Sequence, residues 1–116
     1  VASEYRTDED LLPGARAVVQ GRLPPELIQS IIRAKFGVFR ECYERGLAKN
    51  PNLTGRITTR FVIDRAGNVS DARLDSSTLP DPETTECVVA AFRTFKFYPP
   101  EGGIVTVVYP IVLSPD

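Results

Sequence analysis

Apolar residues recur every three or four positions between residues 25 and 50, which is the spacing of a helix that buries one face. These positions are Leu27, Ile28, Ile31, Ile32, Phe39, Cys42, Tyr43 and Leu47. Pro25 suits the first turn of such a helix. Pro51 ends it, because a proline pushes the residue before it out of the helical conformation. The pattern therefore predicts one long amphipathic helix.

The hydrophobic period changes to two in residues 55–64, which is typical of a strand with one buried face. The side expected to be buried holds Ile57, Thr59, Phe61 and Ile63, and the other side holds Arg56, Thr58 and Arg60. Residues 64–68, DRAGN, suit a hairpin loop in which Gly67 supplies a positive φ. Residues 69–77 form the return strand, and a slip in its alternation after Val69 predicts a β-bulge.

A second helix is expected to follow, with Asp81 as N-cap and Pro82 at the first helical position. Its apolar stripe holds Thr84, Cys87, Val88, Ala91, Phe92 and Phe95. Prolines and glycines then lead into a strand rich in β-branched residues, 104–113. The residues expected to face the core are Val105, Val107, Tyr109, Ile111 and Leu113, and those expected to face outward are Ile104, Thr106, Val108 and Pro110.

These elements predict an α+β fold, in which two helices pack on one face of a three-stranded antiparallel or mixed sheet in the order α-β-β-α-β. A helix that joins two strands of one sheet usually makes them parallel, so the strand order should be second, first, last. The last strand then lies at an edge. Pro110 agrees with this, because a proline has no N–H to donate to a ladder. Residues 15–23 could add an N-terminal strand that covers this edge, and the sequence leaves this open.

The chain has 116 residues, enough for one domain with its own core. Residues 1–13 are polar and acidic and are interpreted as a flexible linker remnant, and residues 14–116 as the domain. Fourteen basic and fifteen acidic residues give a formal net charge of -1, which argues against an electrostatic grip on nucleic acid or anionic lipid. The chain starts at Val1 without a signal peptide, membrane span or methionine, so we interpret it as part of a longer, anchored protein.

The two cysteines lie in the apolar stripes of the two predicted helices. If both helices pack on one face of the sheet, Gly46 and Ala91 are small enough to let them approach closely near Cys42 and Cys87. Two close helices can provide the roughly 4.4–6.8 Å between Cα atoms that a disulfide needs. We favour a disulfide over two free buried thiols, and either over a catalytic or metal-binding pair. A disulfide implies an oxidising compartment such as a bacterial periplasm.

No residue pattern indicates catalysis, so we expect a protein that is not an enzyme and uses no cofactor, metal or small-molecule substrate. The chain has no histidine, which removes the commonest general base and metal ligand. Asp71 and Asp75 lie on one strand with Arg73 between them, so they are interpreted as solvent-exposed rather than as a carboxylate pair. Gly102-Gly103 lacks the lysine and the following helix of a phosphate loop.

Several short motifs together resemble the TonB C-terminal domain family. They are Cys42-Tyr43-Glu44 in the first helix, NPNLTG at residues 50–55, Gly67-Asn68-Val69 at the hairpin, Ser76-Ser77 after the return strand, and Tyr109-Pro110 near the end. The resemblance runs from about Leu23 to Leu113. It is closest to the variant at the C-terminus of envelope proteins of gliding myxobacteria, and the paired cysteines belong to that variant.

The resemblance implies the periplasmic domain of an inner-membrane-anchored protein that reaches across the cell envelope. Such a domain binds an outer-membrane or periplasmic partner by strand addition and passes on work from an inner-membrane motor, here in gliding motility. The edge strand expected to bind the partner is Ile104, Val105, Thr106, Val107, Val108, Tyr109 and Pro110. The alternatives are a structural cap or homodimerisation domain that uses the same edge, and a TonB-type energiser of transport.

Overall fold

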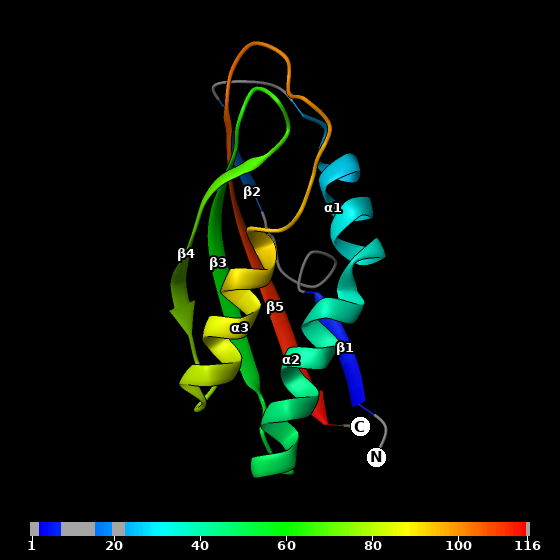
Figure 1. Ribbon diagram of the computed structural model, residues 1–116, viewed down its shortest axis with the longest axis vertical. Helices are drawn as coiled ribbons and strands as arrows, with labels where there is room; N and C mark the ends of the chain where they lie inside the picture. Colours follow the sequence, from blue (N-terminus) through cyan, green and yellow to red (C-terminus); the bar gives the residue numbers. More distant parts are fainter. Residues whose placement is uncertain (1–2, 8–15, 20–22, 116) are drawn as a thin grey trace.

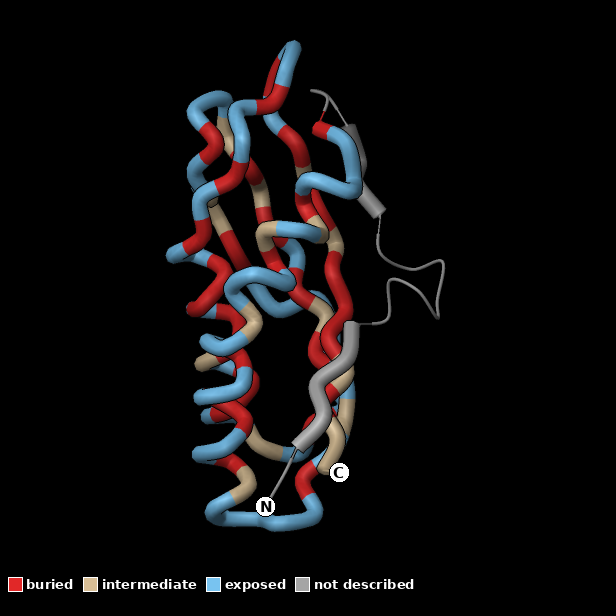
Figure 2. Tube along the Cα trace, turned by 90° about the vertical axis from the view of Figure 1, so that its right-hand side faces the viewer, coloured by how far each residue is buried: buried red, intermediate tan, exposed pale blue. Residues whose placement is uncertain are grey.

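The computed structural model describes residues 3–7, 16–19 and 23–115. The described elements are, in chain order, β1 (Ser3–Thr7), β2 (Arg16–Val19), α1 (Pro25–Ala34), α2 (Phe36–Lys49), β3 (Gly55–Ile63), β4 (Val69–Ser77), α3 (Pro82–Phe92) and β5 (Val105–Pro115). The three helices form one layer against a single sheet, and none of them covers the opposite sheet face (Figures 1 and 2). The predicted α+β class is confirmed.

The sheet confirms the predicted order of its central strands. Strand β3 pairs antiparallel with β4 on one side and with β5 on the other, so β5 runs parallel to β4, as expected for strands joined through a helix. The alternation along β5 is also as predicted. Its core-facing residues are Val105, Val107, Tyr109, Ile111 and Leu113, and all of them are buried.

The sheet is larger than predicted, because two N-terminal strands pair with the outer side of β5. The prediction that the last strand lies at an edge is therefore wrong, since β5 has strands on both sides. Strand β1 pairs along residues 111–115, and β2 pairs along residues 105–108. Strand β2 lies within residues 15–23, where the sequence allowed an N-terminal strand but did not decide whether it joins the sheet. Strand β1 differs from expectation, since it falls within the segment interpreted as a flexible linker. Its short polar stretch shows no strand signal of its own, and pairing with the long β5 supplies the backbone hydrogen bonds that hold it extended.

The single long helix expected between residues 25 and 50 is wrong, because α1 and α2 meet at Lys35. Lys35 has φ -102° and ψ 11°, outside the helical region, and its N–H is shared between the carbonyls of Ile31 and Ile32 at 3.1 and 3.2 Å. Gly37 follows the break, and glycine lowers helix stability by about 1 kcal/mol relative to alanine. The apolar spacing continues across the break, so the hydrophobic pattern carried no sign of it.

Phenylalanine rings from both layers meet in the centre of the core. The ring of Phe92 on α3 lies 4.9 Å from that of Phe61 on β3 and 5.0 Å from that of Phe39 on α2, measured between centroids. All three side chains are fully buried. Burial of each contributes roughly 1.5–3 kcal/mol, which fixes the helices on this face of the sheet.

The β3–β4 hairpin is tied to the loop that follows α3. Gly67 has φ +89°, as its predicted role requires, and its carbonyl accepts a hydrogen bond from the Phe97 N–H at 2.8 Å. The Lys96 Nζ donates to the carbonyl of Ala66 at 2.7 Å. A Cβ added at Gly67 would overlap the carbonyl oxygen of Phe97, so this contact also requires a glycine.

Candidate functional site: the outer edge of strand β5

Alternation along β3 shows which way the peptide groups of β5 point. The Arg56 carbonyl accepts a hydrogen bond from the Thr78 N–H at 2.8 Å, so Arg56 directs its backbone groups toward β4. Direction alternates along an antiparallel strand, so Thr58 also points toward β4, away from its partner Pro110. The even-numbered residues of β5 therefore direct their N–H and C=O groups to the outer edge, where β1 and β2 lie.

Among the described strands, none pairs with β5 beside Pro110 on its outer side. Strand β2 ends its pairing at Val108, and β1 begins at Ile111, so neither pairs with Tyr109 or Pro110. Pro110 directs its ring nitrogen to the outer edge and has no hydrogen to donate there. A continuous ladder is impossible at this position, and the cover consists of two separate short strands.

The structure places the predicted edge residues in three situations. Val105, Thr106, Val107 and Val108 are paired on their outer side by β2. Tyr109 and Pro110 lie between the parts of β5 that β2 and β1 pair, and both side chains are buried. Ile104 lies just before the strand and is 37% exposed. Thr106 and Val108 are half-buried on the sheet face away from the helices, with Arg60 beside Val108 on β3.

At the opposite edge of the sheet, the outer side of β4 is not paired by any described strand. Its outward-directed carbonyl at Ala72 accepts a hydrogen bond from the Arg93 guanidinium at 2.7 Å. Two register shifts interrupt its pairing with β3, one at Ser70, as the sequence predicted, and one at Asp75. Asp71 and Arg73 form an ion pair on this exposed strand. A bulged, charged and capped edge is a poor template for another strand.

The disulfide joins the two longer helices and borders a pocket. Cys42 on α2 and Cys87 on α3 are bonded, with 5.7 Å between their Cα atoms, which confirms the favoured sequence interpretation. A pocket of about 260 Å³ lies beside them, and Arg45 donates a hydrogen bond to the Cys87 Sγ at 2.9 Å. A Cβ at Gly46 would overlap the Thr84 hydroxyl and approach Leu53 to 2.6 Å, so the glycine permits this close helix packing.

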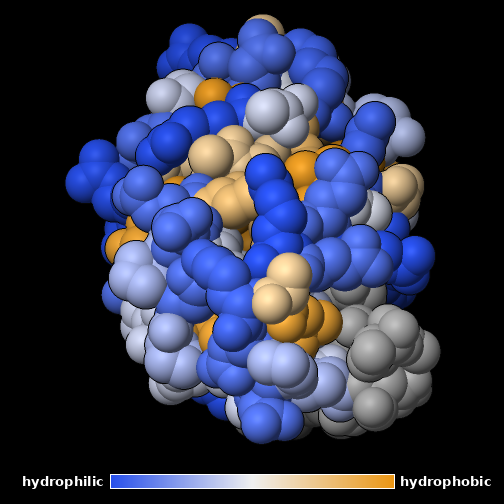
Figure 3. Space-filling view, turned by 60° about the horizontal axis from the view of Figure 1, so that its bottom comes forward, coloured by the Kyte–Doolittle hydropathy of each residue, from blue (hydrophilic) through white to orange (hydrophobic). Residues whose placement is uncertain are grey.

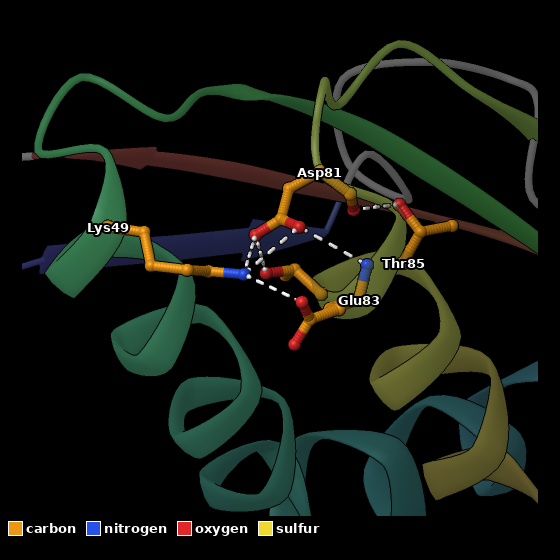
Figure 4. A network of polar contacts seen from close by, with 5 residues as sticks. Lys49, Asp81, Glu83 and Thr85 are labelled. Atoms are coloured by element: carbon orange, nitrogen blue, oxygen red, sulfur yellow. Dashed lines mark hydrogen bonds and ion pairs between the residues drawn. The ribbon is translucent and has the colours of Figure 1, made fainter.

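A polar network stands at the rim of this pocket, where α2 ends and α3 begins (Figure 4). Asp81 caps α3 through the Glu83 N–H at 3.2 Å, as the sequence predicted, and accepts a hydrogen bond from the Thr84 hydroxyl at 2.8 Å. The Lys49 ammonium lies 3.5 Å from Asp81 and 3.4 Å from Glu83. Figure 3, in which this end comes forward, shows mainly hydrophilic residues with small apolar patches between them.

Both ionic partners in the network are held in their charged forms. The Thr84 hydrogen bond, followed by the nearby Lys49 charge, lowers the pKa of Asp81 despite its partial desolvation. Partial desolvation opposes the charged form of Lys49, but its contacts with Glu83 and Asp81 outweigh this and raise its pKa. Shifts in these directions move both groups away from neutral pH, so the pair suits a structural role rather than proton transfer.

Within residues 3–7, 16–19 and 23–115, no group of three or more Asp, Glu or Cys side chains is placed to hold a metal ion. No helix in these ranges has the length and apolar character to cross a membrane. Sequence reasoning missed Arg45 on the disulfide, Lys49 at the helix cap and Arg93 on β4. Each is a surface arginine or lysine whose partner is distant in sequence, so no local pattern marks it.

Comparison with protein-family models, curated proteins and solved structures finds no match for this chain.

Proposed function

We propose that this chain is a non-catalytic protein-interaction domain that binds an extended strand of a partner along the outer edge of β5. One observation carries the proposal: β5 is 11 residues long, and within the described part of the chain its outer side is paired by a five-residue and a four-residue strand only. Backbone groups along an edge give affinity to an incoming strand, and the flanking side chains give it specificity.

The difference between the two edges supports β5 as the binding edge. The exposed strand β4 has bulges, charges and the Arg93 cap, which oppose pairing with another chain. The half-buried outward residues of β5 between Ile104 and Pro110 are uncharged. On the outer side of β5, a partner strand would therefore meet uncharged side chains and a strand without bulges, which β4 does not offer.

The cellular setting of the proposal rests on the resemblance to TonB C-terminal domains. The domain belongs to an inner-membrane-anchored protein, lies in the periplasm, and transmits energy from the inner membrane to an outer-membrane or periplasmic partner in gliding motility. The Cys42–Cys87 disulfide supports this setting, because such bonds persist in oxidising compartments.

Photocrosslinking in cells tests the proposal. A photoreactive amino acid at position 108 of the full-length protein should yield an adduct with an outer-membrane or periplasmic protein, identified by mass spectrometry. The matched control carries the same group at Arg73, whose side chain is 70% exposed on β4. Adducts at 108 no richer than those at 73 would contradict the proposal, and self-adducts would assign the edge to homodimerisation instead.

Substitution then separates binding from folding. Val108→Asp should abolish adduct formation from a crosslinker at position 106, because it places a carboxylate on β5 beside the apolar residues of the incoming strand. Val112→Asp is the matched control, since Val112 lies on the same strand and face but beyond Pro110. Circular dichroism should show both variants folded. Equal crosslinking by the two variants would place the partner elsewhere on the molecule.

A further inference from the structure

The part of β5 expected to bind a partner is already occupied, because β2 pairs with all four residues from Val105 to Val108. Backbone groups that are paired within the chain cannot also pair with a partner strand. The proposed function therefore requires either a different edge or removal of β2. Strand β4 is guarded by the Arg93 contact and by its bulges, so removal of β2 is the route that the structure favours.

We infer that β2 is a replaceable internal strand, and that residues 105–108 of β5 accept an extended apolar peptide in its place; this inference rests on the proposed function. The register of β2 defines the ligand. Its positions opposite Thr106 and Val108 exchange backbone hydrogen bonds with the outward-directed groups of β5, so the ligand has no proline at either of them. Ligand residues opposite Val105 and Val107 share the sheet face of these two buried side chains, so the ligand carries apolar residues at these positions.

Pro110 makes this replacement local. The outer ladder has no donor at Pro110, so β1 and β2 share no continuous row of hydrogen bonds. Strand β2 spans four residues, and only two of its pairs, Arg16 with Val108 and Val18 with Thr106, lie in the hydrogen-bonded register. It can therefore leave while β1 stays paired along residues 111–115. A ligand then binds with an apparent dissociation constant equal to the intrinsic value divided by the fraction of chains in which β2 is open.

Two proline substitutions in the intact chain test the inference. Val18→Pro removes the N–H that pairs with Thr106 and opens β2. Val19→Pro is the matched control, because the neighbouring residue directs its N–H away from β5. The probe is a fluorescent synthetic peptide with the β2 sequence, residues 14–21, GARAVVQG. Fluorescence anisotropy should show at least tenfold tighter peptide binding to the Val18→Pro chain than to the Val19→Pro chain.

A peptide whose own residue 18 is proline should bind neither chain, because it lacks the same donor. Equal affinity of the two chains, or no binding to either, overturns the inference. If Val18→Pro does not fold, replacing residues 16–19 by Ser-Gly-Ser-Gly removes the strand without a proline, and the same tenfold gain is expected. Concentration-dependent dimers of the opened chain that exclude the peptide would also overturn the inference, since the edge would then accept a second copy.

The outcomes for the two proposals can be told apart. Crosslinking to an envelope protein from position 108, together with absence of peptide binding to the opened chain, leaves a protein-interaction domain standing but removes pairing of a partner strand in place of β2. Peptide binding together with absence of an envelope adduct does the reverse.

Discussion

On β4, bulges, charges and a side-chain hydrogen bond oppose pairing with another strand. On β5, two other segments of the chain pair with the outer side of the strand and so occupy it. The β4 edge has bulges at Ser70 and Asp75 and a carbonyl capped by Arg93. The outer side of β5 is covered by β1 and β2, and neither of these described strands pairs with Pro110. The first kind of protection is permanent as long as the domain is folded. The second depends on segments that the proposed strand replacement would remove, and this difference is why we propose the β5 side as the binding edge.

The largest expected effect comes from the disulfide, which holds α3 and therefore the β4 side of the molecule. The double variant Cys42→Ala, Cys87→Ala should lower the free energy of unfolding by about 4 kcal/mol, because the bond closes a loop of 45 residues in the unfolded chain. Urea denaturation measures this. Hydrogen exchange should show the β4 amides losing more protection than those of β5, since α3 packs on β4. Equal losses of protection in β4 and β5 would show that the disulfide does not stabilise the β4 side in particular.

Alanine substitution of one glycine before β4 and one before β5 compares the two turns that lead into these strands. Gly67 precedes β4 and Gly102 precedes β5, with φ +89° and +78°. Gly67→Ala should destabilise the protein by roughly 2–3 kcal/mol, because the new Cβ adds overlap with the Phe97 carbonyl to the backbone strain. Gly102→Ala should cost only about 1 kcal/mol, since a Cβ there meets nothing within 4 Å. Thermal denaturation gives both values, and similar costs would show that the hairpin contact adds nothing.

Removing the Arg93 hydrogen bond should make the outer side of β4 more available for pairing with another strand. Arg93→Met loses one hydrogen bond to the Ala72 carbonyl, which costs about 1 kcal/mol, and frees that acceptor for another chain. Sedimentation velocity should detect self-association that the unmodified protein does not show at the same concentration. Arg65→Met, which removes an exposed arginine from the hairpin, is the control. If the Arg93→Met protein stays monomeric, the bulges and charges of β4 are sufficient to prevent pairing without the Arg93 hydrogen bond.

The smallest expected effect concerns pH at the start of α3. Because the pKa of Asp81 is lowered below its ordinary value of 3.8, its contribution to stability is complete above that value and is lost as pH falls through the lower folded pKa. Asp81→Asn keeps the helix cap but removes this titration. Melting temperatures of the two proteins should converge as pH is lowered below 3.8. A constant difference across this range would exclude Asp81 as the titrating group.

Most of the layer structure could be predicted from the sequence, because it depends on local periodicity. The alternation in residues 55–64 and 104–113 identified β3 and β5 and their buried sides, and Asp81-Pro82 identified the start of α3. The break at Lys35 escaped prediction, since it is a backbone rearrangement within an unbroken apolar period. The pairing of β1 with the outer side of β5 was not predicted for a different reason. The residues of β1 are polar, and their pairing depends on a strand more than 100 positions away in the chain.

The candidate site was predicted only in part for the same reason. The β-branched run and Pro110 predicted an edge at the last strand, but which segment lies beside that strand is a property of the assembled sheet. Likewise, the contacts of Arg45 and Arg93 join residues 42 and 21 positions apart in the sequence.

The close approach of α2 and α3 at Gly46 links several residues that would otherwise vary independently. A larger side chain at this position would push against Thr84 and Leu53 and so spread the helices. Spreading would separate Cys42 from Cys87 and draw Lys49 away from the capped start of α3. Among proteins descended from a common ancestor with this one, glycine 46, the paired cysteines and the capped helix start should be inherited together. Loss of any one should be accompanied by substitution of the others.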